Sequence, residues 1–109
     1  MSDLKIQKVS PKDLKIGDLI LDVRTNKEVN EKVLAMPFIH EDSATIDIDE
    51  CIKKYKLDGK KTLNILCLGG KRATEVAEKF IKSGYNNVKV IDGGIIEAEK
   101  EGVKVITKK

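Results

Sequence analysis

One short segment of the chain combines a sulfur nucleophile, two glycines and two cations. It consists of Cys67, Leu68, Gly69, Gly70, Lys71 and Arg72. Paired glycines let the backbone turn several N–H groups toward one point, where they bind an anion. Cys67 would be held there as a thiolate, and Lys71 and Arg72 would attract an anionic substrate. The segment therefore predicts a catalytic cysteine, with residues 68–72 as its substrate-binding loop.

Hydrophobic patterning places this loop between a strand and a helix. Residues 62–68 are rich in apolar side chains, as in a strand buried on both faces. Apolar residues at helical spacing follow the glycines and predict a helix with one face against a core: Ala73, Val76, Ala77, Phe80 and Ile81. The helix would add the positive end of its dipole at the loop. Sites in parallel sheets form at the carboxyl ends of strands, which is where this pattern puts Cys67.

Strand and helix patterns alternate along the rest of the chain. Further strands are expected at residues 18–23, 44–48 and 88–91. Helices are expected from Pro11 to Gly17 and at residues 27–34, 50–56 and 95–100, the first three of them capped by Ser10, Asn26 and Asp49. This order predicts an α/β fold with a central, mostly parallel sheet and helices on both faces. At 109 residues, the chain has room for a single domain over residues 1–109.

Composition and charge exclude several classes of function. The chain has 21 Lys and Arg against 18 Asp and Glu, and this small, evenly spread excess does not indicate a nucleic-acid surface. The longest apolar run is residues 65–68, far short of the ~20 residues of a membrane span. One His and two Cys provide neither a zinc cluster nor a disulfide framework, so we expect no metal. With no secretory signal visible, we expect a cytoplasmic protein without a membrane partner.

Other chemistry-bearing residues are given supporting or structural roles. Asp22 and Arg24 end a neighbouring strand and are interpreted as a buried ion pair that supports the loop, with Arg72 among its partners. Cys51 is expected to be a core thiol, and it could resolve a modified Cys67 only if the two lay close together. The single histidine, His40, is expected at the surface rather than acting as a general base.

The active loop and one other segment resemble the rhodanese-like domain family. Cys67, Gly70 and Arg72 match the family's C-x-x-G-x-R loop. Residues 21–25, Leu-Asp-Val-Arg-Thr, are similar to its L-D-V-R-T segment. Glu28 then falls where an acidic residue often follows.

Two later turns extend the resemblance, which spans Val9 to about Val105. Residues 83–88 are similar to the family's G-[FY]-x-x-V turn, and residues 92–95 to its x-G-G-[IW] turn. Residues 36–44 depart from the G-H-I-P-G-A segment that is usual in the family. Glu99 stands where an aromatic residue is common, and Ala73 where a serine is frequent. These departures leave the loop intact but change the walls of the substrate pocket.

The resemblance implies a thiosulfate sulfurtransferase. In that reaction the Cys67 thiolate takes the outer sulfur of thiosulfate or a similar small anionic donor and becomes a persulfide. A thiol, a protein cysteine or, in the test tube, cyanide then removes that sulfur. The resemblance implies no metal and no organic cofactor, and we expect the chain to act as a monomer.

Three alternatives remain open at this stage. The domain could be a persulfide carrier that serves one partner, or a rhodanese-like binding module without activity. It could also be a cysteine-based phosphatase or arsenate reductase of the same fold. Those enzymes have a C-x5-R loop, whereas only four residues separate Cys67 from Arg72, and this smaller loop favours sulfur over phosphate.

Overall fold

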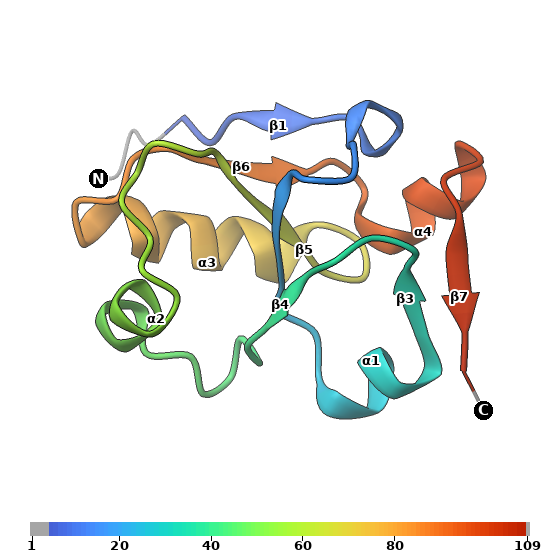
Figure 1. The fold of residues 1–109 in the computed structure, drawn as a ribbon, viewed down its shortest axis with the longest axis horizontal. Coiled ribbons are helices and arrows are strands. Elements are labelled where there is room, and N and C mark those ends of the chain that lie inside the picture. Colours follow the sequence, from blue (N-terminus) through green and yellow to red (C-terminus); the bar gives the residue numbers. More distant parts are fainter. Residues whose placement is uncertain (1–4, 109) are drawn as a thin grey trace.

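Five parallel strands form the central sheet of the computed structural model, which describes residues 5–108 (Figure 1). In spatial order they are β1 (Lys8–Val9), β6 (Val88–Ile91), β5 (Leu63–Leu66), β2 (Leu19–Asp22) and β4 (Ile39–His40). The central strand β5 pairs with both neighbours, and Ile65 lies opposite Leu21 on one side and Val90 on the other. All four residues of β5 are buried, as expected for a parallel strand covered on both faces.

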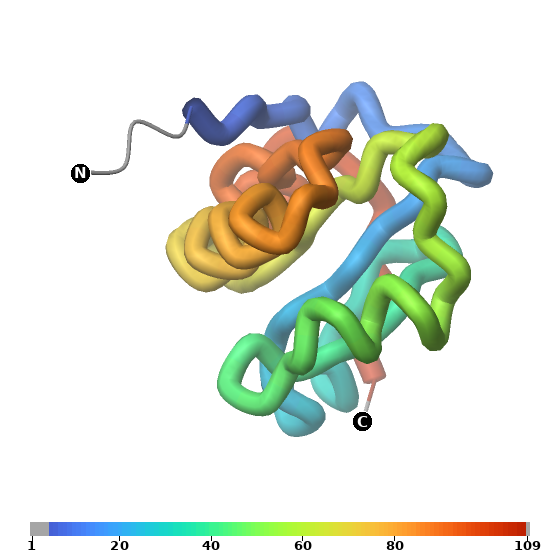
Figure 2. The backbone as a smooth tube through the Cα atoms, turned by 90° about the vertical axis from the view of Figure 1, so that its left-hand side faces the viewer, coloured from blue at the N-terminus to red at the C-terminus, as the bar shows by residue number. Residues whose placement is uncertain are grey.

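Helices cover both faces of this sheet, which confirms the predicted α/β fold. They are the 3-10 helix η1 (Pro11–Asp13) and the α-helices α1 (Asn26–Glu31), α2 (Ile48–Lys54), α3 (Lys71–Lys82) and α4 (Gly94–Lys100). Helices α2 and α3 pack on one face, and η1 and α4 pack on the other. Figure 2 views the molecule from the end where α2 and the last turns of α3 lie, with α4 more distant.

The first core lies between the sheet and helices α2 and α3. Successive residues of a strand point to opposite faces, so Leu21 and Val23 enter this core while Ile20 enters the other. The predicted helical stripe is confirmed, since Ala73, Val76, Ala77 and Phe80 are buried in α3 and Ile81 is partly buried. This packing holds α3 against β5 and β6, and thereby sets the position of its first turn.

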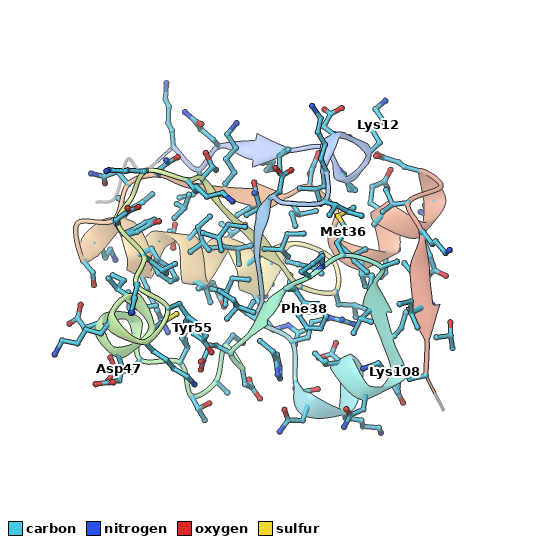
Figure 3. The ribbon with its side chains drawn as sticks, viewed as in Figure 1. Lys12, Met36, Phe38, Asp47, Tyr55 and Lys108 are labelled. Atoms are coloured by element: carbon cyan, nitrogen blue, oxygen red, sulfur yellow. The ribbon has the colours of Figure 1, made fainter. Side chains whose placement is uncertain are left out.

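The second core lies beneath η1 and α4. Its buried members are Leu14, Ile20, Leu34, Leu66, Ile91, Ile95 and Ala98. Met36 and Phe38, from the segment between β3 (Lys32–Leu34) and β4, pack against it (Figure 3). Helix α4 is thus anchored to the face of the sheet opposite α3.

A second sheet of two antiparallel strands adjoins the second core. It pairs β3 with β7 (Val105–Thr107), and Val33 lies opposite Ile106. The helix predicted over residues 27–34 is therefore wrong at its end, because the chain leaves the helix after Glu31 to pair with β7. Its N-cap is also one residue earlier than predicted, since Thr25 caps α1.

The segment before α2 differs most from the prediction. Residues 44–48 do not form the expected strand, because the N–H groups of Thr45 and Ile46 donate to the Asp42 carbonyl and turn the chain. Asp47 rather than Asp49 caps α2, its carboxylate accepting the Glu50 N–H at 3.1 Å.

Two predicted elements are shorter in the structure than the sequence pattern indicates. The helix expected from Pro11 to Gly17 is only η1, and Ser10 donates to Glu101 instead of capping it. The strand expected over 62–68 is limited to the four residues of β5. No helix of residues 5–108 has the length and apolar character needed to cross a bilayer.

Candidate functional site

The Cys67 sulfur lies inside a turn formed by its own loop. The loop begins after β5 and ends where α3 begins at Lys71. The sulfur accepts the Gly70 N–H at 2.9 Å and the Ala73 N–H at 3.4 Å, and Cys67 is only 1% exposed. Gly70 has φ +113°, a conformation that residues with a side chain rarely adopt. The second glycine of the loop thus allows backbone donors to surround the sulfur.

The first turn of α4 holds the outside of this loop. The N–H groups of Ile95 and Ile96 donate to the carbonyls of Cys67 and Leu68 at 3.0 and 3.2 Å. Gly94 has φ +63°, and a Cβ there would overlap both of these carbonyl oxygens. The loop therefore directs the carbonyl oxygens of Cys67 and Leu68 toward α4 and the Gly70 N–H toward the sulfur.

Arg72 is held by an ion pair with Glu28. Its two terminal nitrogens donate to the two carboxylate oxygens at 2.8 and 2.9 Å, the bidentate geometry typical of strong pairs. The hydrogen bonds from Arg72 are the main reason that the pKa of Glu28 falls from 4.5 to about 2, while Glu28 raises the pKa of Arg72. The Arg72 guanidinium was predicted to bind the donor, but in this structure it is engaged by Glu28.

Glu28 itself is positioned by the start of α1. Its backbone N–H donates to Thr25 Oγ1 at 3.2 Å, and its side chain accepts the Thr25 backbone N–H at 3.0 Å. This is a capping box, and the Thr-x-x-Glu spacing could have located it from sequence. The pairing with Arg72 could not be located in that way, because it joins two segments far apart in the chain.

Asp22 and Arg24 form a buried ion pair beside the loop. Arg24 Nη2 lies 2.7 Å from Asp22 Oδ2, and the residues are 2% and 1% exposed. Arg24 also donates to the carbonyls of Glu28 and Lys32, at 3.4 and 2.7 Å. The predicted buried pair is therefore present, but its bonds go to α1 and β3. The prediction that Arg72 is a partner of this pair was wrong.

His40 and Cys51 have different surroundings in the structure. His40 lies at the end of β4, half-buried, and its Nε2 lies 2.7 Å from the Arg24 carbonyl. Cys51 is a free thiol in the first core, as expected. Burial raises the pKa of Cys51 to about 11, which keeps this thiol protonated and unreactive.

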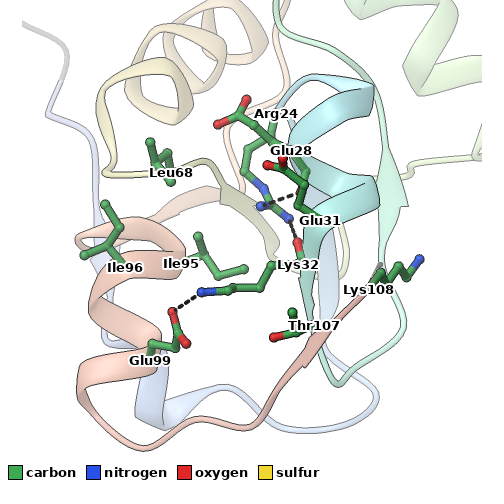
Figure 4. Close-up of a pocket in the computed structure, with 10 residues that line it drawn as sticks. All are labelled: Arg24, Glu28, Glu31, Lys32, Leu68, Ile95, Ile96, Glu99, Thr107 and Lys108. Carbon is green, nitrogen blue, oxygen red and sulfur yellow. Dashed lines mark hydrogen bonds and ion pairs between the residues drawn. The ribbon is translucent and has the colours of Figure 1, made fainter.

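The exposed side of the loop is formed by Leu68, Gly69 and Lys71. Lys71 is the first residue of α3 and extends into solvent, so its charge is accessible to an anion. Leu68 borders a groove of about 400 Å³ that lies between the loop, α4 and the β3–β7 pair (Figure 4). Within residues 5–108, no three His, Cys, Asp or Glu side chains are grouped as metal ligands.

Comparison with known proteins defines the family to which this fold and loop belong. Residues 7–101 match the family model of the rhodanese-like domain, so the chain is a member of the rhodanese-like domain family. No curated protein matches the chain.

Solved structures from several organisms share this fold, and three of them are the following. A rhodanese-related protein from Thermoplasma volcanium is 28% identical, with TM-score 0.68 over 92% of this chain and 97% of that chain. The BH2092 protein from Bacillus halodurans is 25% identical, with TM-score 0.74 over 93% and 77%. An NAD-dependent persulfide reductase from A. fulgidus is 24% identical, with TM-score 0.66 over 84% of this chain but only 16% of that chain. This last likeness shows the shared fold alone.

Proposed function

We propose that this protein is a sulfurtransferase that carries sulfane sulfur as a persulfide on Cys67. The observation that carries the proposal is the pair of N–H donors, from Gly70 and Ala73, that point at the Cys67 sulfur. Backbone donors fixed around a sulfur stabilise its anionic forms, both the attacking thiolate and the persulfide that follows. Membership of the rhodanese-like family supports the same chemistry. The name of the similar A. fulgidus protein also connects a chain containing this fold with persulfides.

The reaction proceeds in two displacements at sulfur. The Cys67 thiolate attacks the outer sulfur of thiosulfate, the S–S bond of the donor breaks, and sulfite leaves with the electron pair. An acceptor thiolate then attacks the outer sulfur of the persulfide, and Cys67 leaves as a thiolate. Each displacement forms one bond to the transferred sulfur and breaks another, with no net oxidation or reduction. It therefore requires neither a metal nor an organic cofactor.

The loop cations have different roles in this proposal. Lys71 is exposed and attracts the oxygen atoms of the anionic donor. Arg72 holds the loop to α1 through Glu28 and contributes its positive charge mainly within that pair. A phosphatase would need the arginine to face the bound anion, and the bonds of Arg72 to Glu28 favour sulfur transfer over that alternative.

Intact mass spectrometry tests the proposal directly. The protein is incubated briefly with thiosulfate, or with polysulfide as a second donor, and is measured before and after addition of cyanide. We expect a gain of one sulfur atom that cyanide removes. The Cys67→Ser variant should show no gain, and Cys51→Ser, the matched control, should behave as the parent protein does.

The result would separate this function from its alternatives. No sulfur gain with either donor would leave a binding module or a phosphatase, and hydrolysis of an aryl phosphate that depends on Cys67 would establish the latter. Slow removal by cyanide together with fast removal by one protein thiol would identify a dedicated carrier.

A further inference from the structure

The groove beside the Cys67 loop has the size of a small-molecule site. Its volume is about 400 Å³, within the range of roughly 300–1,000 Å³ that is usual for such sites. Figure 4 shows its lining side chains arranged around a shared space, with Leu68 from the loop on one side and Lys32 from β3 on the other. A thiosulfate ion would occupy only a small part of this volume.

Apolar side chains gather at the loop side of the groove. Leu68 and Ile96 are 43% and 46% exposed, and both line the groove together with Ile95. They account for two of the four large hydrophobic side chains that are exposed in residues 5–108. The Ile96 N–H bonds to the Leu68 carbonyl at 3.2 Å, which keeps these two residues adjacent. Neighbouring exposed apolar side chains at a concave surface indicate a binding site.

The charges around the groove cancel. Six charged side chains line it, three of each sign: Arg24, Lys32, Lys108, Glu28, Glu31 and Glu99. Four of these six are held in ion pairs. Lys32 pairs with Glu99 at 2.7 Å across the groove, whereas Arg24 and Glu28 pair with Asp22 and Arg72 outside it. The remaining two, Glu31 and Lys108, are one acid and one base. An anion would gain little electrostatic attraction from this lining. The lining therefore does not favour an anion over a neutral molecule.

The accessible cation of the loop lies outside this groove. Lys71 is exposed but is not among the lining residues. The site therefore has a cationic part at Lys71, suited to an anionic donor, and a charge-balanced apolar part at Leu68. The far wall of the groove includes Thr107 and Lys108, which follow the end of the family match at residue 101. This wall is thus contributed by a segment outside the part that the family model covers.

We infer that the groove binds the aliphatic body of a neutral organic thiol, which accepts the sulfur from Cys67. The inference rests on the proposed function. The thiolate of the bound molecule attacks the outer sulfur of the Cys67 persulfide, a new S–S bond forms, and the bond to Cys67 breaks. The products are an organic persulfide and the Cys67 thiolate, with no net oxidation or reduction. Leu68 and Ile96 hold the carbon chain of the acceptor beside the loop.

Single-turnover sulfur removal tests this inference. The protein is loaded with thiosulfate or polysulfide, freed of donor, and mixed with mercaptoethanol, mercaptohexanol or mercaptohexanoate, and cyanide serves as the reference acceptor. The rate of sulfur loss is followed by intact mass. We expect mercaptohexanol to react about tenfold faster than mercaptoethanol, which corresponds to about 1.4 kcal/mol. Four added CH₂ groups, worth about 0.8 kcal/mol each when fully buried, supply this even in an open groove.

Two variants make the assignment specific to the groove. Ile96→Ser should reduce the preference for mercaptohexanol to about twofold, because it removes apolar contact. Ile16→Ser should keep the tenfold preference, since Ile16 is 78% exposed and does not line the groove. Mercaptohexanoate should react more slowly than mercaptohexanol, because the charge of Lys108 in the lining is offset by that of Glu31 and attracts the carboxylate only weakly.

The outcomes distinguish this inference from the proposed function. If cyanide removes the sulfur but the two neutral thiols react equally fast, the acceptor assignment is overturned and the sulfurtransferase proposal stands. The same holds if Ile96→Ser retains the full preference, or if mercaptohexanoate matches mercaptohexanol. If neither donor loads Cys67, both proposals are overturned.

Discussion

The Glu28–Arg72 ion pair joins the first turn of α1 to the first turn of α3, and Glu28→Gln should weaken that connection. Glutamine has nearly the same shape and retains one oxygen that can accept the Thr25 N–H, so the capping box is largely preserved. The substitution removes the negative charge that receives two hydrogen bonds from Arg72. The protein should therefore fold to the same structure with a lower free energy of unfolding.

The depressed pKa of Glu28 sets the size of this effect. A fall from 4.5 to about 2 corresponds to about 3.4 kcal/mol if all of it is converted to stability. The Glu28 side chain is 23% exposed and that of Arg72 is 30% exposed, so water screens the pair. We expect Glu28→Gln to lower the free energy of unfolding by about 1–2 kcal/mol at neutral pH.

The direction of the pH dependence follows from the same shift. The folded state favours the ionised carboxylate, so its contribution is fully present above pH 4.5 and is lost as the pH falls toward about 2. Urea unfolding, followed by circular dichroism, should therefore show a lower free energy of unfolding for Glu28→Gln than for the parent protein at neutral pH. This difference in free energy should be clearly smaller at about pH 3.

Glu31→Gln is the matched control for this prediction. Glu31 lies on the same helix, is exposed, and makes no ion pair among residues 5–108. Adding Arg72→Gln and the double variant with Glu28→Gln completes a double-mutant cycle that isolates the pair. If Glu28→Gln matches Glu31→Gln at neutral pH, or if its difference from the parent protein does not become smaller in acid, the ion pair does not stabilise the site.

Other predictions concern the loop and the second cysteine. Gly94→Ala should cost about 2 kcal/mol or more in urea unfolding, because positive φ and overlap with the loop carbonyls act together. Gly102→Ala, where φ is +83° but the space is open, should cost less, and equal losses would contradict the overlap. Lys71→Ala should raise the KM for thiosulfate about fivefold, equivalent to about 1 kcal/mol, and an unchanged KM would remove Lys71 from donor binding. Cys51, with its pKa near 11, should resist iodoacetamide in the folded protein and react once urea unfolds it.

The segments that the sequence predicts well are determined by residues that lie close together in the chain. The apolar runs of β2, β5 and β6 and the stripe of α3 are explained by burial against a core, which residue type and spacing reveal. The Cys67 loop was also located, because two glycines between a strand and a helix restrict what the backbone can do.

The errors depend on partners that are distant in the chain. Residues 32–34 become β3 only because β7 supplies hydrogen bonds, and no local pattern distinguishes them from the end of a helix. Strand β4 has only two residues and follows from pairing with β2. In the same way, the pairing of Arg72 with Glu28 joins distant segments that no local pattern connects, whereas donor binding by Arg72 stays a prediction. Residue types indicated which charges are near the loop, but not which of them neutralise one another.

The contact between α4 and the Cys67 loop has a consequence for the order in which the site is made. The loop carbonyls are received by the N–H groups of Ile95 and Ile96, which follow the loop by the whole of α3 and β6. During synthesis, Cys67 therefore leaves the ribosome well before the residues that orient its loop. A nascent chain that stops short of residue 93 would hold its sulfur in a loop free to rotate its peptide groups. The Cys67 sulfur would acquire its surroundings late, close to the moment at which the second core closes.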